Sequence, residues 1–228
     1  MNSRYSNLLT VLLVVIIIAI IGIIAFLGYK YYKNESLKNN AEEFVDSFND
    51  QNINNGNNDG NSNVIGDGSN IFDGVDEGTN NGNQNPSTSD KTEQYNGYDM
   101  IGTIEIPATN VKYPILSNAE LSKSALETSI VELYGPGLNQ IGNTTLAGHN
   151  FRDGTFFSNN KKLNSGDKIY ITDLNGKRLT YTIYNKYETD ENDAKYMTRD
   201  TQGAIEISLS TCTDDSKARL IIWAKADV

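Results

Sequence analysis

The segment DKIYITDLNGKRLTYTIYNKYE, residues 167–188, decides the fold class of this 228-residue chain. Apolar and polar residues alternate on both sides of Asn175-Gly176, and many of them are aromatic or β-branched. Asn-Gly between two alternating runs is the strongest short-range signal for a tight turn joining antiparallel strands. The segment therefore predicts a β-hairpin.

Short β-prone runs separated by turn residues continue on both sides of this hairpin. They are MIGTIEI (100–106), VKYPIL (111–116), NTTLAGH (143–149), GAIEISLST (203–211) and ARLIIWAKA (218–226). NAELSKSALE, residues 118–127, is the best helix candidate, with Asn118 as its N-cap. Because the region after Met100 shows no βαβ rhythm, we expect an all-β fold, a closed or nearly closed β-barrel over residues 100–228.

An apolar segment, LLTVLLVVIIIAIIGIIAFL at residues 8–27, lies near the start of the chain and carries no charge. Twenty helical residues rising about 1.5 Å each span about 30 Å, the hydrocarbon thickness of a bilayer. The segment is longer than the core of a secretory signal, so we expect residues 1–38 to hold an uncleaved membrane anchor. Three lysines (30, 33 and 38) follow it and only Arg4 precedes it, which favours a cytoplasmic C-terminal part.

Residues 39–99 are rich in Asn, Gly, Asp and Ser, and carry most of the net charge of −10. Such a composition buries too little apolar surface to offset the entropy of ordering the chain. We therefore predict a disordered acidic linker over residues 39–99, and expect residues 1–99 to contribute nothing to the folding of the barrel.

Cysteine and histidine each occur once, as Cys212 and His149. A single cysteine allows no internal disulfide, so any thiol chemistry depends on Cys212. A catalytic thiol needs a base or a positive charge nearby, and His149 and Arg219 would supply both. Each residue also has a simpler explanation, as a packed thiol, a turn histidine or an arginine at a sheet edge. The folded part is slightly acidic and has no basic stripe, which argues against nucleic-acid binding.

Three sequence motifs carry a family resemblance: GNTTLAGHN (142–150), SLSTC (208–212) and ARLIIWAKA (218–226). In this order, after an anchor and a linker, they resemble the sortase family, the membrane-anchored cysteine transpeptidases of Gram-positive bacteria. IGTIEIP and YPIL also look like the sortase opening, so the resemblance covers residues 100–226. Ser208 is a mild departure from the family pattern.

The resemblance implies an eight-stranded barrel in which Cys212 attacks the threonine carbonyl of an LPxTG-like sorting signal on a surface protein. An amine on a peptidoglycan precursor, or another acceptor, would then resolve the thioacyl intermediate. His149 would transfer protons, Arg219 would contact the oxyanion, and Thr211 with Ser210 would support the site. The resemblance implies no cofactor; calcium activation, known in part of the family, needs acidic ligands that the sequence does not place.

Location and subclass also follow from the resemblance. It implies a cytoplasmic N-terminus and an extracellular barrel, against the lysine count. GHNFRDGTFFSNNKKLNSGDKIYITD, residues 148–173, looks most like class D, with class B next.

Two other functions are considered. L,D-transpeptidases place a histidine two residues before the cysteine, where this chain has Ser210. The non-enzyme alternative is a membrane-tethered binding module displayed at the cell surface, in which Cys212 is only packed. Thiol alkylation distinguishes it, because a packed thiol would be inert.

Overall fold

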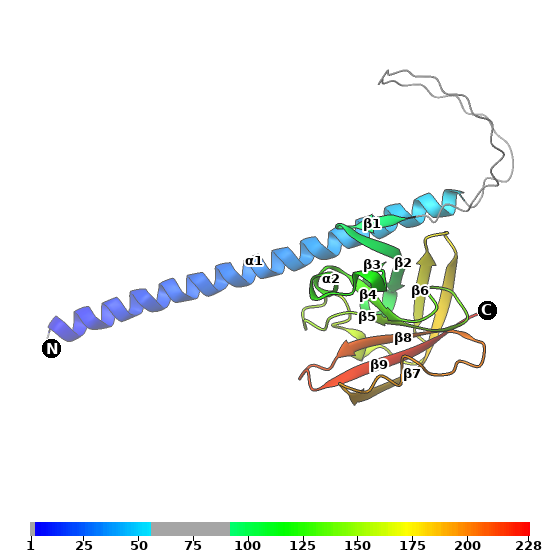
Figure 1. The fold of residues 1–228 in the computed structure, drawn as a ribbon. Coiled ribbons are helices and arrows are strands. Elements are labelled where there is room, and N and C mark those ends of the chain that lie inside the picture. The colour runs from blue at the N-terminus through cyan, green and yellow to red at the C-terminus, as the bar shows by residue number, and fades with distance from the viewer. Residues whose placement is uncertain (1–2, 56–91) are drawn as a thin grey trace, which may run out of the picture.

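The computed structural model describes residues 3–55 and 92–228, and most of the predicted linker, residues 56–91, lies outside the described residues. The described chain forms a long helix, α1 (Ser3–Asn55), and a β-barrel. Figure 1 shows α1 lying along one side of the barrel, with its N-terminal part projecting well beyond it.

The strands within the described residues form one continuous sheet. Their bounds are β1 (Glu93–Tyr95), β2 (Tyr98–Ile106), β3 (Val111–Leu116), β4 (Ile130–Tyr134), β5 (Gly142–Ala147), β6 (Lys168–Asp173), β7 (Arg178–Asp190), β8 (Ile205–Cys212) and β9 (Ala218–Ala226). The order is β1-β2-β3-β4-β5-β8-β9-β7-β6, and β2 also pairs with β6. That last pairing closes β2 to β9 into an eight-stranded barrel, as expected. The β3–β4 and β5–β8 pairs are parallel and the others antiparallel.

The hairpin predicted around Asn175-Gly176 is confirmed. β6 and β7 pair from Lys168↔Thr182 to Thr172↔Arg178. Gly176 has a φ of +79°, a conformation that glycine adopts without strain. The Asp173 carboxylate accepts hydrogen bonds from the backbone N–H groups of Asn175 and Lys177, at 3.0 and 3.1 Å, and so fixes the turn.

The single helix predicted over residues 118–127 is wrong. Residues Asn118–Glu120 form a 3₁₀ turn, and helix α2 (Lys123–Thr128) starts separately. Two serines explain the break, because each side chain caps a new start: Ser117 accepts from the N–H of Ala119, and Ser122 from that of Ala125. Asn118 is therefore not the N-cap.

The apolar segment of α1, residues 8–27, is exposed on all sides. Its leucines, valines and isoleucines are about half exposed or more. The helix is long and apolar enough to cross a membrane, by length and composition. A soluble helix would bury one face, so this exposure fits an anchor.

The C-terminal half of α1 packs on the barrel, which corrects the prediction for residues 39–55. Apolar side chains at Leu37, Ala41, Phe44, Val45 and Phe48 recur at helical spacing, and together they span about three turns. Ala41 and Val45 are fully buried, and Phe48 is nearly so. The average composition of residues 39–99 does not reveal this apolar stripe, because most residues of that segment are polar.

Polar contacts also fix α1 on the barrel. Asn49 donates to the Glu105 carboxylate at 2.9 Å and accepts from the Thr103 hydroxyl at 3.3 Å. Asp46 pairs with Lys112 on β3. The prediction of a disordered linker is also wrong near its C-terminal end, where β1 (Glu93–Tyr95) pairs with β2. Helix and barrel therefore share one core.

A chain that begins at Thr92 should unfold at a lower temperature than one that begins at Asn34. Burying a valine or phenylalanine side chain contributes about 1.5–3 kcal/mol, and each kcal/mol moves Tm by about 2–8 °C. Part of this gain is offset by the entropy of ordering the helix, so we expect a difference of several degrees. Thermal unfolding of both chains measures it, and equal midpoints would contradict the contribution of α1.

Candidate active site

Strand register brings His149, Cys212 and Arg219 to one end of the barrel. β8 lies between β5 and β9 in the sheet. Cys212, the last residue of β8, pairs directly with Arg219 on β9. On the other side β5 runs parallel to β8, and Ala147 pairs with Ser210. His149 follows Ala147 by two residues and so lies level with Cys212.

The guanidinium of Arg219 contacts the thiol directly. Its Nη1 donates to Cys212 Sγ at 2.8 Å. Because a guanidinium has only donors, the sulfur is the acceptor in this contact. Cys212 is partly exposed rather than buried in the core. A cysteine that served only packing would lie among apolar side chains, so this contact favours a chemical role.

His149 lies beside a second aromatic ring in the loop after β5. Its imidazole stacks on the Phe151 ring, with centroids 4.6 Å apart. Burial lowers the pKa of His149, because desolvation disfavours the imidazolium. The charge of Glu127 opposes this shift, whereas those of Lys123 and Arg219 lower the pKa further. The neutral imidazole is therefore favoured.

Thr211 and Ser210 lie beneath these side chains as buried supports. The Thr211 hydroxyl donates to the Gly148 carbonyl at 2.7 Å, which ties the end of β5 to that of β8. At Gly148 a Cβ would lie 2.5 Å from a methyl of Ile130 and 2.9 Å from the Phe157 ring, so any larger residue before His149 would have to displace these buried side chains. Ser210 Oγ lies 3.1 Å from the hydroxyl of Tyr196.

Asn150 is a site residue that the sequence analysis missed. Its side-chain amide donates to the backbone carbonyl of Cys212 and to the Asp214 carboxylate, both at 3.0 Å. It thereby holds the His149 loop against the end of β8. Its position directly after His149 was the available signal.

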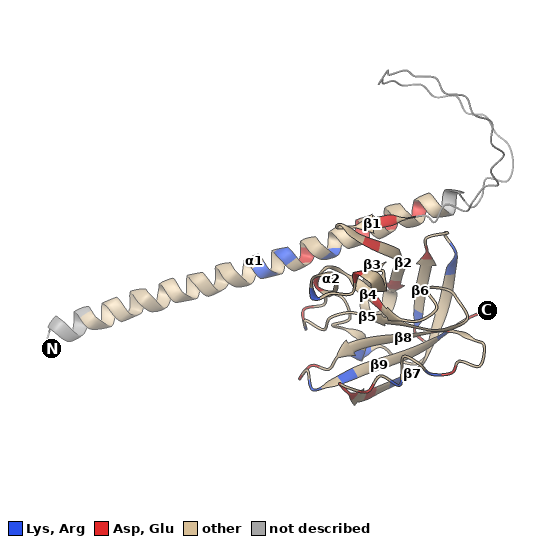
Figure 2. Ribbon diagram, viewed as in Figure 1, with Lys and Arg blue, Asp and Glu red and all other residues tan. Residues whose placement is uncertain are grey.

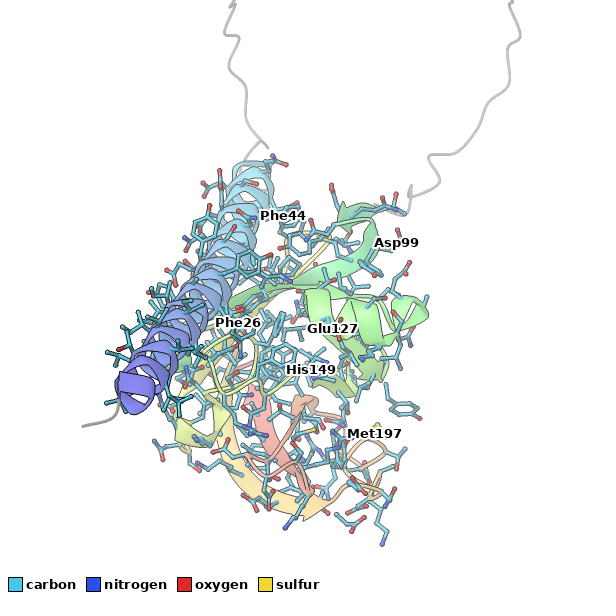
Figure 3. All side chains as sticks on the ribbon, turned by 90° about the vertical axis from the view of Figure 1, so that its left-hand side faces the viewer. Phe26, Phe44, Asp99, Glu127, His149 and Met197 are labelled. Carbon is cyan, nitrogen blue, oxygen red and sulfur yellow. The ribbon has the colours of Figure 1, made fainter. Side chains whose placement is uncertain are left out.

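A cleft of about 510 Å³ opens at this end of the barrel. His149, Cys212 and Arg219 all line it, together with apolar side chains from other elements: Leu126, Leu133 and Met197. Figure 3 views the molecule from this side, where His149 and Met197 both face the reader. A second hollow of about 300 Å³ also reaches Cys212 and is lined by Asn150, Glu188 and Asp214. The thiol is thus accessible from two hollows.

Comparison with protein families now decides the identity of the fold. The family model described as "Sortase domain" matches residues 104–227, more than half of the chain.

The chain belongs to the sortase family.

Two curated sortases are similar to it in sequence. Sortase A of Bacillus anthracis is 32% identical over 130 residues, which is 54% of this chain and 58% of that protein. Sortase A of Streptococcus agalactiae is 32% identical over 137 residues, 56% of this chain and 53% of that protein. The match therefore spans little more than half the length of these relatives.

Solved sortase structures share the fold. Sortase A from Corynebacterium diphtheriae matches with 26% identity and a TM-score of 0.51, covering 57% of this chain and 62% of that one. A Clostridium perfringens Sortase D5 transpeptidase matches with 28% identity and a TM-score of 0.51, covering 57% and 80%. Because these relatives bear the names of different subclasses, the comparisons establish the sortase family and not the class D assignment.

The lowered pKa of His149 predicts that this sortase loses stability in acid. An unfolded histidine has a pKa of about 6.5, so below that pH the unfolded chain binds the proton more readily than the folded one. Stability contributed by the neutral imidazole is present above pH 6.5 or so and falls as the pH drops through the folded pKa. We expect His149→Gln to weaken this fall. Urea unfolding of both proteins between about pH 5 and 7.5 tests it, and parallel curves would contradict it.

Proposed function

We propose that this sortase is a cysteine transpeptidase that cleaves an LPxTG-like sorting signal after its threonine and transfers the product to an amine. The contact of Arg219 Nη1 with Cys212 Sγ carries the proposal. It places a permanent cation on the only thiol of the chain, in a cleft that His149 also lines. A nucleophile, a proton carrier and an oriented donor are what acyl transfer requires.

The reaction consists of two acyl transfers. The thiol proton of Cys212 passes to His149, and the sulfur forms a bond to the threonine carbonyl carbon. The carbon–nitrogen bond to the next residue then breaks, and His149 gives its proton to the leaving amine. In the second half, the acceptor amine attacks the thioester, His149 takes the amine proton, the carbon–sulfur bond breaks, and His149 returns that proton to Sγ to regenerate the thiol.

Arg219 stabilises the oxyanion in each half. During attack the carbonyl carbon is bonded to Sγ, so its oxygen lies within a short reach of the guanidinium that contacts the sulfur at 2.8 Å. A guanidinium has five N–H donors in a rigid fork and can hold both atoms. Its β-strand position limits its movement, which preorganises the donors.

The shape of the cleft suits a short extended peptide. Its volume of about 510 Å³ falls in the range of sites that enclose small ligands. Leu126, Leu133 and Met197 offer apolar contacts, which fit an apolar side chain such as the leucine of the sorting signal.

Location and partners follow from this activity. We infer that the N-terminus is cytoplasmic and the barrel extracellular, because the amine acceptors of the cell wall lie outside the membrane. The partners are then surface proteins that carry a sorting signal, and a peptidoglycan precursor or another amine acceptor. The class D assignment remains part of this proposal.

Mass spectrometry of the barrel with a library of sorting peptides tests the activity. The expected result is a thioacyl adduct on Cys212, with a mass equal to the peptide portion up to threonine. Cys212→Ala serves as the matched control and should form none. An unmodified barrel that also resists alkylation at Cys212 would favour the binding module.

A further inference from the structure

Helix α1 contacts both ends of the barrel, and the two contacts differ in distance from the apolar segment. Near that segment, Asn34 donates to the Asp153 carboxylate at 2.8 Å. Asp153 belongs to the loop that begins directly after His149. About five helical turns further on, Asn52 lies against Gly176, where an added Cβ would be 3.1 Å from the Asn52 Cβ. Gly176 is in the turn between β6 and β7.

These two contacts mark opposite ends of the barrel. β7 begins at Arg178, beside the turn that contains Gly176. It ends near Thr189, which pairs with Arg219, and Arg219 pairs with Cys212. The thiol therefore lies at the end closer to the apolar segment. Figure 3 looks from the side toward which the N-terminal part of α1 projects, and His149 is on the face seen there.

The rise of the helix gives the distance of each of the two contacts from the end of the apolar segment. The apolar segment ends at Leu27, and α1 continues without interruption to Asn55. At about 1.5 Å per residue, Asn34 lies about 10 Å beyond Leu27 and Asn52 about 38 Å beyond it. The headgroup region adds only about 5–8 Å to each side of the hydrocarbon. The His149 end therefore lies next to the headgroups, and the turn of Gly176 far above them.

A pocket lies between α1 and the barrel, close to the end of the apolar segment. It has a volume of about 410 Å³ between α1 and the loop of residues 153–159. From the helix it is lined by Leu27, Lys30, Tyr31, Asn34, Glu35 and Lys38, and the loop contributes a second carboxylate, Asp153. Lysine and tyrosine at the end of a spanning segment are typical of the lipid interface. Figure 2 shows basic residues on α1 just after the long tan stretch that contains the apolar segment.

We propose that α1 holds the barrel directly on the membrane surface, with the end that carries His149 and Cys212 facing the bilayer. The occupant of the pocket between α1 and residues 153–159 is then the headgroup layer of the bilayer that α1 spans. This arrangement rests on the proposed function only in its naming of that end as the active site. A sorting signal still retained in the membrane would reach the cleft at the height where it emerges.

Quenching by headgroup-labelled lipid tests the orientation. The full chain is prepared with Cys212→Ala and one new cysteine for a fluorophore, either Lys217→Cys or Asn175→Cys. Lys217 is exposed in the loop after Cys212, and Asn175 is exposed in the opposite turn. In phosphatidylglycerol–phosphatidylcholine vesicles with a short-range nitroxide on the headgroup, we expect strong quenching at position 217 and little at 175. Equal quenching, or the reverse order, would overturn the proposal.

A second pair of variants tests whether docking of α1 sets the orientation. Val45→Asp introduces a charge at a fully buried helix position, whereas Ser47→Asp introduces it at an exposed one on the same helix. Val45→Asp should abolish the difference in quenching between the two labels, and Ser47→Asp should preserve it. Near-ultraviolet circular dichroism checks that the barrel remains folded. A difference unchanged by Val45→Asp in a folded barrel would overturn the role of docking.

The two proposals fail separately. Every quenching variant lacks the thiol of Cys212, so the outcome does not depend on catalysis. A barrel that forms the thioacyl adduct but shows no preferred orientation would contradict only the membrane arrangement. A barrel that is oriented but forms no adduct would contradict only the proposed function.

Discussion

We expect Cys212→Ala to abolish both cleavage of a sorting peptide and transfer to an amine, and to leave the barrel folded. The chain has no second cysteine that could replace this nucleophile. Loss of the nucleophile should lower kcat/KM by about 10⁴-fold or more, as in enzymes that act through a nucleophile and its base. Because Cys212 is partly exposed, removing its sulfur leaves no large cavity. Peptide cleavage measured together with thermal unfolding checks both parts.

Cys212→Ser is the matched control for this prediction. Serine keeps nearly the same shape but is a much weaker nucleophile at its ordinary pKa, so this variant should also be nearly inactive. Substantial turnover by the alanine variant would contradict the role of Cys212 as the nucleophile. A large fall in Tm would instead show that the contact between Sγ and Arg219 serves the fold.

Arg219→Lys should be nearly as damaging as Arg219→Ala. Lysine keeps the positive charge but replaces the planar fork by a single ammonium on a flexible stem. If aimed donors stabilise the oxyanion, both variants lose much of the about 10²–10³-fold that one such donor contributes. We expect this result because Arg219 lies on β9, paired directly with Cys212, and its Nη1 already contacts the sulfur.

The comparison between the two arginine variants separates charge from geometry. It requires kcat/KM on one sorting peptide, with thermal unfolding as the control for folding. Wild-type activity in the lysine variant alone would show that only the positive field matters. Wild-type activity in both variants would show that Arg219 has no role in the reaction.

Local alternation made most of the barrel predictable from the sequence. β6, β7 and β8 alternate between apolar and polar residues, β9 is a mostly apolar β-prone run, and turn residues lie between them, so their existence follows from the pattern. β4 was missed because it is short and pairs in parallel with β3 through only Ile115↔Ile130 and Leu116↔Val131. Its identity as a strand depends on distant partners.

The packed half of α1 was missed for a different reason. Residues 39–55 share a polar composition with residues 56–91, and an average over residues 39–99 hides the stripe of Ala41, Val45 and Phe48. Burial of those side chains needs the surface of β3 and its neighbours, which composition does not describe. A periodicity test in a short window would have found the stripe.

The sequence motifs located the candidate site residues but not the contacts between them. His149, Cys212 and Arg219 lie on segments whose proximity depends on strand register, a tertiary property. The supporting role of Asn150 depends on the carbonyl that its side chain reaches, which no spacing rule reveals.

The parallel pairing of β5 with β8 has a consequence for the nascent chain. Gly142 pairs with Ile205, so the chain between them must be synthesised and its loop closed before this contact can form. Contacts between distant segments form slowly, because loop entropy is lost before the pairing compensates for it. Until then Cys212 has no imidazole beside it, although Arg219 can already pair with it across the local β8–β9 hairpin. The thiol and the imidazole therefore come together only through a long-range contact, whereas the thiol and the guanidinium meet through a short-range one.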